Sequence, residues 1–530
     1  MALQGKQLIA GVFEAKGTET YQAVDASTNT PFGVHFVEGT VAEVAAAAKA
    51  AADSFDALRT ATVEARGQLL DHIADEIMAL GDDLLEMAHQ ETGLPMGRCT
   101  GERGRAVNQI RLFANVIREG SWVNARIDTA NPDRTPAPKP DVRSMLVGIG
   151  PVAVFGASNF PLAIGVAGTD TVTALGAGCP VVVKAHPAHP GTSELLAMAI
   201  TKAVKAAGFP AGIFSMVHGR GHEVGLAMAR DPHIKAVAFT GGLRGGRALF
   251  DAAAARPEPI PVYAEMGSTN PVFLLPGALK ARSADIAKGY LQSVNLGVGQ
   301  FCTNPGILLG LKGEGMSSFQ QASGELATAV TPATMLHAGI SKAFADGVDK
   351  IGQTPGVSVL GQSADAPAVA TQAGCAIFAT DIDTLKQTPY LMEEVFGPTS
   401  IVVACNSVEE MEEMAEGLEG HLSATVHGTP EDLAAHKNLI QILEKKVGRI
   451  IINGYPTGIE VCAAMHHGGP YPASTDSHYT SIGTGSLLRF GRPVCYQGFP
   501  NDLLPPQLRN ANEKGIWRMV NNEMTRENVG

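Results

Sequence analysis

Apolar residues recur every three or four positions in the early part of the chain, and this spacing predicts a helical layer. The pattern is clear over residues 41–58 and 62–90, and a further helix is expected over 102–118. Residues 128–143, rich in proline and charge, break the pattern and predict an exposed arm or linker.

From residue 144 onward, short apolar runs alternate with helical segments. This alternation predicts right-handed βαβ units and a parallel sheet with helices on both faces. The expected strands cover residues 152–155, 181–184, 213–217 and 236–239, and the expected helices cover 162–175, 193–207 and 224–230.

Several polar or glycine residues directly follow these strands. They are Asn159, Lys184, Gly219 and the run 240–242. Because ligands of parallel sheets bind at the carboxyl ends of the strands, we expect these residues to gather at one edge. A second α/β region is expected over residues 263–451, with strands at 272–275, 306–310 and 400–403, and the tail after residue 477 is rich in loops.

Length and composition limit the class of protein. A chain of 530 residues exceeds the size of one hydrophobic core, so two or three subdomains are expected. The net charge of −12, without a basic run, argues against nucleic-acid binding and favours a small soluble substrate.

The chain has neither a secretory signal nor a stretch near ~18 apolar residues, so no membrane span is expected and a cytoplasmic location is favoured. Seven scattered cysteines without a Cys-x-x-Cys pair predict neither a disulfide framework nor a metal site.

Two short glycine-flanked segments carry candidate catalytic groups. Cys302 lies in Gly-Gln-Phe-Cys-Thr, and Glu265 lies in Tyr-Ala-Glu-Met-Gly-Ser. A thiol and a carboxylate can form a covalent acyl-enzyme and then hydrolyse it. Between apolar Ala264 and Met266, the pKa of Glu265 is expected to be raised. Taken alone, a free cysteine is more often a small buried apolar residue, and a lone glutamate is more often a surface carboxylate.

Two further motifs complete a resemblance. Asn159 lies in Gly-Ala-Ser-Asn-Phe-Pro, and residues 393–398 read Glu-Glu-Val-Phe-Gly-Pro. These four motifs, which follow one another along the chain as Asn159, Glu265, Cys302 and residues 393–398, resemble the aldehyde dehydrogenase superfamily. Residues 184–192 and 467–475 resemble its NADP-preferring branch, which includes α-ketoglutarate semialdehyde (2,5-dioxopentanoate) dehydrogenases and a fatty-aldehyde dehydrogenase.

The resemblance implies an α/β fold with a Rossmann-type cofactor domain, an α/β catalytic domain and a β oligomerisation arm. It also implies a homodimer or homotetramer. The expected boundaries are 1–127 with 144–262 for the cofactor domain, 263–476 for the catalytic domain, and 128–143 with 477–530 for the arm and tail.

The resemblance also assigns catalytic roles. Cys302 would attack the aldehyde, and the Asn159 amide and the Cys302 backbone N–H would stabilise the oxyanion. Glu265 would then activate the water that hydrolyses the thioester. His467 could help form the thiolate or relay a proton, although a structural role is nearly as plausible and His466 is its neighbour.

Cofactor residues follow from the same resemblance. Lys184 would bind the adenosine ribose or a 2′-phosphate, and Glu394 the nicotinamide ribose. Pro187 stands where NAD-specific relatives commonly carry a Glu, and no carboxylate follows until Glu194, so NADP is expected and NAD is left open. The full predicted set is Lys184, Phe155, Arg220, Gly221, Gly225, Thr240, Gly241, Gly242, Glu394 and Phe396.

The substrate is the least determined feature. Arg105, Asn108 and Gln109 share one helix face, and with Phe160 they are expected to line the substrate tunnel. An arginine there could clamp the distal carboxylate of 2,5-dioxopentanoate, or it could be a solvated surface residue. A fatty or other uncharged aldehyde, a coenzyme-A-dependent acylation and a catalytically silent paralogue remain alternatives.

Overall fold

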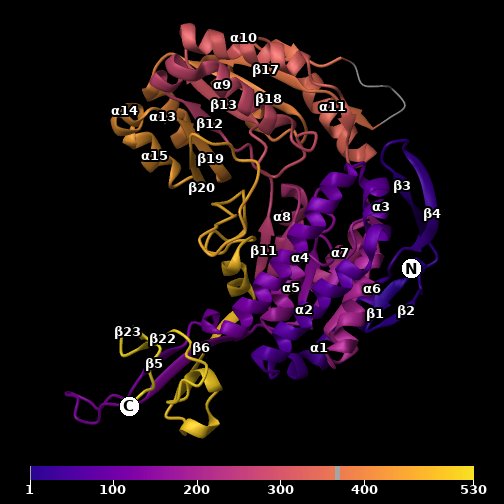
Figure 1. Cartoon of the computed structure of the whole chain (residues 1–530), viewed down its shortest axis with the longest axis vertical. Helices are drawn as coiled ribbons and strands as arrows, with labels where there is room; N and C mark the ends of the chain where they lie inside the picture. Colours follow the sequence, from indigo (N-terminus) through magenta and orange to yellow (C-terminus); the bar gives the residue numbers. More distant parts are fainter. Residues whose placement is uncertain (1, 365–370) are drawn as a thin grey trace.

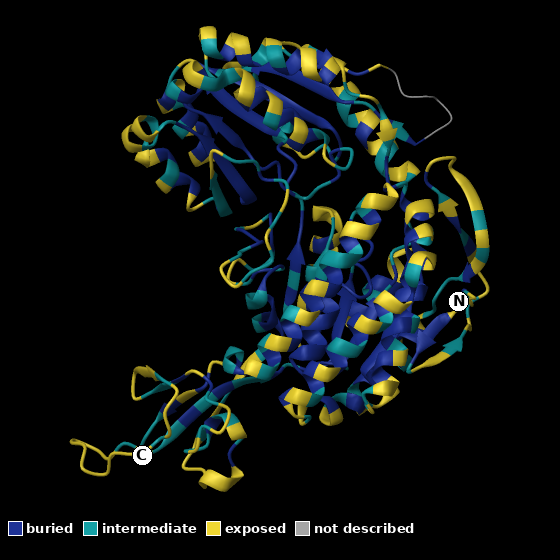
Figure 2. Ribbon diagram, in the orientation of Figure 1, coloured by how far each residue is buried: buried dark blue, intermediate teal, exposed yellow. Residues whose placement is uncertain are grey.

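The computed structural model describes residues 2–364 and 371–530, so residues 365–370 of the expected catalytic domain lie outside the description. Two seven-stranded sheets form two lobes, and an arm of strands leaves the first lobe towards the C-terminus (Figure 1). Figure 2 shows that both sheets are buried and that exposed residues lie on the outer helices and the arm.

The first sheet has five parallel strands, extended at one edge by two antiparallel N-terminal strands. Its order is β11 (Val262–Glu265), β10 (Ala236–Thr240), β7 (Val152–Phe155), β8 (Val181–Lys184), β9 (Phe214–Val217), β1 (Gln7–Ile9) and β2 (Val12–Glu14). The strand order therefore reverses between β7 and β10, where a parallel sheet offers a crevice for a ligand.

Helices cover both faces of this sheet because its strands are apolar on both sides. Val152 and Val154 pack into one core cluster, and Ala153 and Phe155 into another on the opposite face. The covering helices are α1 (Val41–Arg59), α2 (Val63–Ala79), α3 (Gly81–Thr92), α4 (Met96–Glu119), α5 (Thr169–Gly176), α6 (Pro190–Ala206), α7 (His222–Arg230) and α8 (Leu243–Ala254).

The second sheet is parallel except for one edge strand. Its order is β15 (Ser358–Gln362), β17 (Ala376–Asp381), β18 (Thr399–Cys405), β13 (Ile307–Leu311), β12 (Val272–Leu274), β19 (His421–His427) and β20 (Val447–Ile452). Its helices are α9 (Pro276–Asn295), α10 (Glu314–Thr328), α11 (Ala338–Gly352), α12 (Ile382–Gln387), α13 (Val408–Gly417), α14 (Pro430–Ala435) and α15 (Lys437–Leu443).

The arm joins segments far apart in the sequence. Its five strands lie in the order β21 (Gly491–Gln497), β6 (Val142–Gly148), β5 (Arg126–Asp128), β22 (Arg518–Val520) and β23 (Glu523–Thr525). Two small ladders complete the described strands: β3 (Thr20–Asp25) with β4 (Thr30–Val37), and β14 (Ala333–Thr334) with β16 (Gln372–Ala373).

Two helix predictions need correction. The helix expected over residues 162–175 begins only at Thr169. The residues before Thr169 form an irregular turn, in which Gly165 and Gly168 pack closely against the backbone of the residues that precede them. The helix expected over 62–90 is two helices, divided at Gly81, whose φ of +60° ends a regular helix.

The segment from Tyr263 was assigned to the second α/β region, yet β11 pairs with β10 in the first sheet. Glu265 therefore ends a strand of the first sheet, at the edge nearest the second lobe. Among the described residues, no helix combines the length and apolarity that a membrane crossing requires.

Candidate active site

Cys302 lies in a tight loop between α9 and β13. The preceding residues Gly297, Val298 and Gly299 have φ of +58°, +58° and +66°, a region that a β-branched residue such as Val298 rarely adopts. A Cβ on Gly299 would lie 2.2 Å from the carbonyl carbon of Gly397. The loop is thus held against the 393–398 segment, and such strained backbone is common at functional sites.

Polar side chains fix the carbonyl groups of the same loop. The Asn270 amide donates to the Cys302 carbonyl at 2.9 Å and to the Asn304 carbonyl at 3.0 Å. The Asn159 amide donates to the Gln300 carbonyl at 3.0 Å. Asn159, at the carboxyl end of β7, therefore reaches the Cys302 loop from the other lobe.

Glu265 is buried at the end of β11 and is held by a segment from the C-terminal region. Met266 donates its backbone N–H to the Ala473 carbonyl at 2.8 Å, and Glu265 forms a β-bridge with Ser474. The Ser481 hydroxyl donates to the Glu265 carboxylate. Residues 467–481 thus wrap the end of the first sheet.

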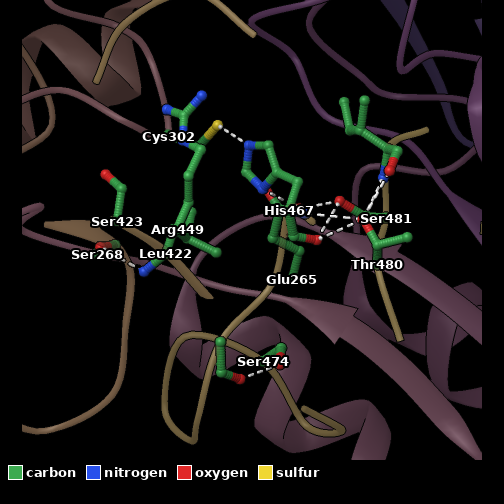
Figure 3. A network of polar contacts seen from close by, with 12 residues as sticks. Glu265, Ser268, Cys302, Leu422, Ser423, Arg449, His467, Ser474, Thr480 and Ser481 are labelled. Atoms are coloured by element: carbon green, nitrogen blue, oxygen red, sulfur yellow. Dashed lines mark hydrogen bonds and ion pairs between the residues drawn. The ribbon is translucent and has the colours of Figure 1, made fainter. Parts of the chain in front are cut away.

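His467 lies between the thiol and the carboxylate (Figure 3). Its Nε2 is 3.4 Å from Cys302 Sγ, and its Nδ1 is 3.0 Å from Glu265 Oε2. Thr480 Oγ1 accepts the His467 backbone N–H at 2.8 Å, which fixes the loop. Cys302, His467 and Glu265 therefore form a connected thiol, imidazole and carboxylate, the arrangement of a base-activated nucleophile.

The electrostatics of this group differ from the expectation for Glu265. Burial acts to raise the pKa of Glu265, but contacts with His467 and Ser481 lower it below the ordinary value. The expected raised pKa is therefore wrong, because its argument considered only the apolar neighbours in sequence. Contacts with His467 and Ser481 thus favour the ionised form of the Glu265 carboxyl.

The Cys302 thiol is shifted the opposite way. Burial, followed by the carboxylates of Glu265 and Glu394, raises the pKa of Cys302 well above its usual value, and Arg449 partly opposes the shift. The thiol is therefore protonated at rest and needs a base. His467 Nε2, 3.4 Å from Sγ, is a candidate for that base.

The 393–398 segment approaches the same site. A Cβ on Gly267 would lie 2.4 Å from Glu394 Oε2, so the carboxylate lies beside the Glu265 strand end. Glu394 and Phe396 line one cavity with Ser268 and Thr269. Glu394, predicted to bind the nicotinamide ribose, and Phe396 of the predicted cofactor set thus lie next to the catalytic group.

The residues predicted for the cofactor gather at the carboxyl edge of the first sheet. The Lys184 ammonium donates to the Gly219 carbonyl, and burial lowers its pKa to about 8, although Glu38 opposes this shift. A Cβ on Gly225 would lie 3.3 Å from the Phe155 ring, so Gly225 permits a close approach of α7.

The turn after β10 supplies a second binding feature. The Gly241 N–H donates to the Glu265 carbonyl at 3.1 Å, which ties Thr240-Gly241-Gly242 to the catalytic strand. Gly242 is the N-cap of α8, so no capping side chain covers the first-turn N–H groups. Such a helix N-terminus favours an anion, and with the Lys184 ammonium it fits a dinucleotide.

The predicted substrate helix is α4, and its three residues differ in position. Asn108 is exposed, and Gln109 is buried and donates to Thr169 Oγ1 at 2.6 Å. Arg105 lies 5.6 Å from the Phe160 ring, and its Nε has no hydrogen-bond partner among the described residues. Phe160 in turn packs edge-on against Phe301, with ring centroids 5.3 Å apart.

Sequence reasoning missed four residues that the fold brings to these sites: Asn270, Arg449, Ser481 and Glu38. They act through contacts with residues distant in the chain, and none lies in a motif that indicated the role. It also predicted no metal site, yet the ligand atoms of Glu265, Cys302 and His467 lie within 4.8 Å of one another and could hold a metal ion.

Known proteins resemble this chain over nearly its whole length. The model of the aldehyde dehydrogenase family matches residues 13–474. The chain is 48% identical over 520 residues to α-ketoglutaric semialdehyde dehydrogenase 2 of Azospirillum brasilense, covering 98% of this chain and 99% of that protein. It is 45% identical over 522 residues to α-ketoglutaric semialdehyde dehydrogenase of Acinetobacter baylyi, with coverage of 98% and 99%.

Solved structures share the fold at lower identity. A putative aldehyde dehydrogenase from Burkholderia cenocepacia has a TM-score of 0.77 at 21% identity, covering 93% of this chain and 99% of that chain. An NAD+ complex of aldehyde dehydrogenase from Bacillus cereus has a TM-score of 0.79 at 22% identity, with coverage of 93% and 96%. At such identities the likeness shows the fold alone.

Proposed function

The chain belongs to the aldehyde dehydrogenase family, and we propose that it oxidises 2,5-dioxopentanoate to 2-oxoglutarate with NADP, and also NAD, as hydride acceptor. The contact of Cys302 Sγ with His467 Nε2, backed by Glu265, is the observation that supports this chemistry most directly. The names of the two relatives support the choice of substrate.

In the proposed first half-reaction, His467 Nε2 takes the thiol proton and Cys302 attacks the aldehyde carbon. The ionised Glu265 stabilises the imidazolium through Nδ1. The Asn159 amide and the Cys302 backbone N–H receive the developing oxyanion. A nicotinamide dinucleotide held by residues such as Lys184 and Glu394 would supply the hydride acceptor for oxidation of the thiohemiacetal to the thioester.

In the second half-reaction, Glu265 accepts a proton from the attacking water. The carbon–sulfur bond then breaks, and the departing thiolate regains its proton from His467. The free acid leaves, and the proton on Glu265 passes to solvent. This order makes His467 the base before hydride departure and Glu265 the base after it.

His467→Asn tests the proposed base. We expect turnover at pH 7 to fall on the order of 100-fold, since a positioned general base contributes about that factor or more. Part of the loss should return at alkaline pH, because Cys302, whose pKa is raised, then ionises unaided. A pH profile of kcat/KM measures both effects.

The matched control is His466→Asn, which changes the neighbouring, partly exposed imidazole. Its pH profile should match that of the unaltered enzyme. If His467→Asn lowered activity by one constant factor at every pH, the role of His467 would be structural.

Two cations beside Cys302 support a substrate with a distal carboxylate. Arg105 reaches the site from α4, and Arg449 from β20. Burial lowers the pKa of both arginines, and the charge of the Cys302 thiolate opposes this shift in each. Both guanidinium groups are therefore close enough to Cys302 to interact with its charge. Arg105 Nε, which has no hydrogen-bond partner in the described part of the chain, is suited to a carboxylate oxygen.

Arg105→Met removes this charge and keeps the length of the side chain. We expect kcat/KM for 2,5-dioxopentanoate to fall on the order of 100-fold, the value of a strong charged hydrogen bond. Activity on hexanal should change little. Arg111→Met on the exposed side of the same helix is the control.

The same kinetic panel tests the alternative substrate class. Phe160 and Phe301 form an apolar surface that would suit an uncharged aldehyde. If the unaltered enzyme oxidised dodecanal more efficiently than 2,5-dioxopentanoate, the proposed substrate would be wrong.

We further propose a cytoplasmic homodimer or homotetramer, assembled through the arm. The arm and tail expose large apolar side chains: Phe499 by 46%, Leu503 by 71%, Trp517 by 48% and Met524 by 58%. Such a concentration is expected where another surface covers it. We also propose the division into residues 1–127 with 144–262, 263–476, and 128–143 with 477–530, with residues 263–265 moved to the first unit because β11 belongs to the first sheet.

A further inference from the structure

We propose that Glu38 sets the choice between NAD and NADP. Its carboxylate binds Arg220 beside Lys184, and its negative charge repels a 2′-phosphate at that position. The inference rests on the proposed function, because it takes the adenosine end of the cofactor to lie at Lys184. Glu38 lies in the short connection between β4 and α1.

Glu38 holds Arg220 by two contacts. Its Oε1 accepts from Arg220 Nε at 2.6 Å, and its Oε2 accepts the Arg220 backbone N–H at 2.8 Å. The Arg220 guanidinium also lies 5.0 Å from the Tyr21 ring of β3. The β3–β4 hairpin therefore positions Arg220, a cation of the predicted cofactor set.

The same carboxylate acts on Lys184. Both side chains meet the short loop after β9, since the Lys184 ammonium donates to the carbonyl of Gly219, the residue before Arg220. A Cβ on Gly219 would lie 3.6 Å from Glu38 Oε2. Glu38 opposes the effect of burial on the pKa of Lys184, so the two charges interact.

Glu38 changes the argument for cofactor choice. In the sequence, Glu194 is the first carboxylate after Lys184, and this long gap underlies the expectation of NADP. Glu194 is buried, accepts the backbone N–H of Gly5 at 2.9 Å and lies 3.8 Å from His218 Nε2, and the charge that acts on the pKa of Lys184 is that of Glu38. The carboxylate at this site instead comes from the N-terminal part of the chain, through folding.

The charge balance predicts acceptance of both cofactors. A 2′-phosphate carries almost two negative charges at pH 7 and would be attracted by Lys184 and Arg220. Glu38 repels it and competes for Arg220. The Arg220 side chain is 53% exposed and that of Glu38 19%, so solvent screens the pair and Arg220 can exchange partners at modest cost.

Glu38→Gln removes the charge and keeps an oxygen that can accept the Arg220 N–H. Calorimetric titration should show NADP and adenosine 2′,5′-bisphosphate binding about tenfold more tightly, as expected for one nearby charge partly screened by solvent. The dissociation constants of NAD and 5′-AMP should not fall. Glu19→Gln removes the same charge from an exposed residue just before β3, whose carbonyl accepts the Glu38 backbone N–H, and should leave the ratio unchanged within about twofold.

Arg220→Gln provides an independent test that does not depend on the folding of the Glu38 variant. It should weaken NADP about tenfold and leave NAD unaffected. If Glu38→Gln changed the NADP-to-NAD ratio no more than Glu19→Gln, or Arg220→Gln left NADP affinity unchanged, the inference would be wrong. If the unaltered chain bound neither dinucleotide, the proposed function itself would fail.

Discussion

Cys302→Ala should lower aldehyde oxidation by at least about 10⁴-fold, the largest effect expected of any single substitution here. Without the thiol no covalent adduct forms, and a planar aldehyde carbonyl does not release hydride. Steady-state formation of NADPH or NADH from 2,5-dioxopentanoate measures the loss. Calorimetric titration of the same variant should show unchanged dinucleotide affinity, since Lys184 and the α8 N-terminus are intact.

Cys495→Ala is the matched thiol control. This cysteine is exposed on β21 of the arm, and its removal should leave turnover unchanged. Persistent turnover in Cys302→Ala would show that another group is the nucleophile. A loss of dinucleotide binding in that variant would instead indicate a general collapse of the site.

Glu265→Gln has the second largest expected effect, a loss of steady-state turnover of about 10²–10⁴-fold. The amide cannot accept a proton from water, so the thioester should accumulate. Rapid mixing should therefore show a burst of reduced dinucleotide close to one equivalent per site, followed by slow turnover. The burst itself should be slower than in the unaltered enzyme, because His467 loses its anionic partner.

Two other outcomes would redirect the assignment of Glu265. A slow first turnover without a burst would mean that Glu265 acts only through His467, before hydride departure. Near-normal activity that stalls without coenzyme A would indicate acyl transfer rather than hydrolysis. Ser481→Ala removes the hydroxyl donor to Glu265 and retains the carboxylate. Its first-turnover burst should have the same amplitude as that of the unaltered enzyme.

Local patterns predicted much of this architecture. The apolar runs at 152–155 and 181–184 coincide with β7 and β8, and the edge expected to gather Asn159 and Lys184 does so because parallel strands end on the same side. The helix expected at 162–175 was too long because periodicity alone did not weigh the close packing at Gly165 and Gly168.

Long-range contacts explain what the sequence could not provide. Glu265 and Ser481 are far apart in the chain, and their contact, with that of His467, reverses the expected shift in the pKa of Glu265. Glu38 likewise reaches Lys184 and Arg220 only after the β3–β4 hairpin folds onto the loop after β9. Such pairings depend on tertiary packing, which periodicity and local spacing do not encode.

The most direct test of the account is peptide mass spectrometry of Glu265→Gln quenched with acid after one turnover of 2,5-dioxopentanoate. The account predicts a 2-oxoglutaryl group on the peptide that contains Cys302, in near-stoichiometric amount with the reduced dinucleotide formed. Reduced dinucleotide formed in the first turnover, with that peptide unmodified or the acyl group on another residue, would contradict it.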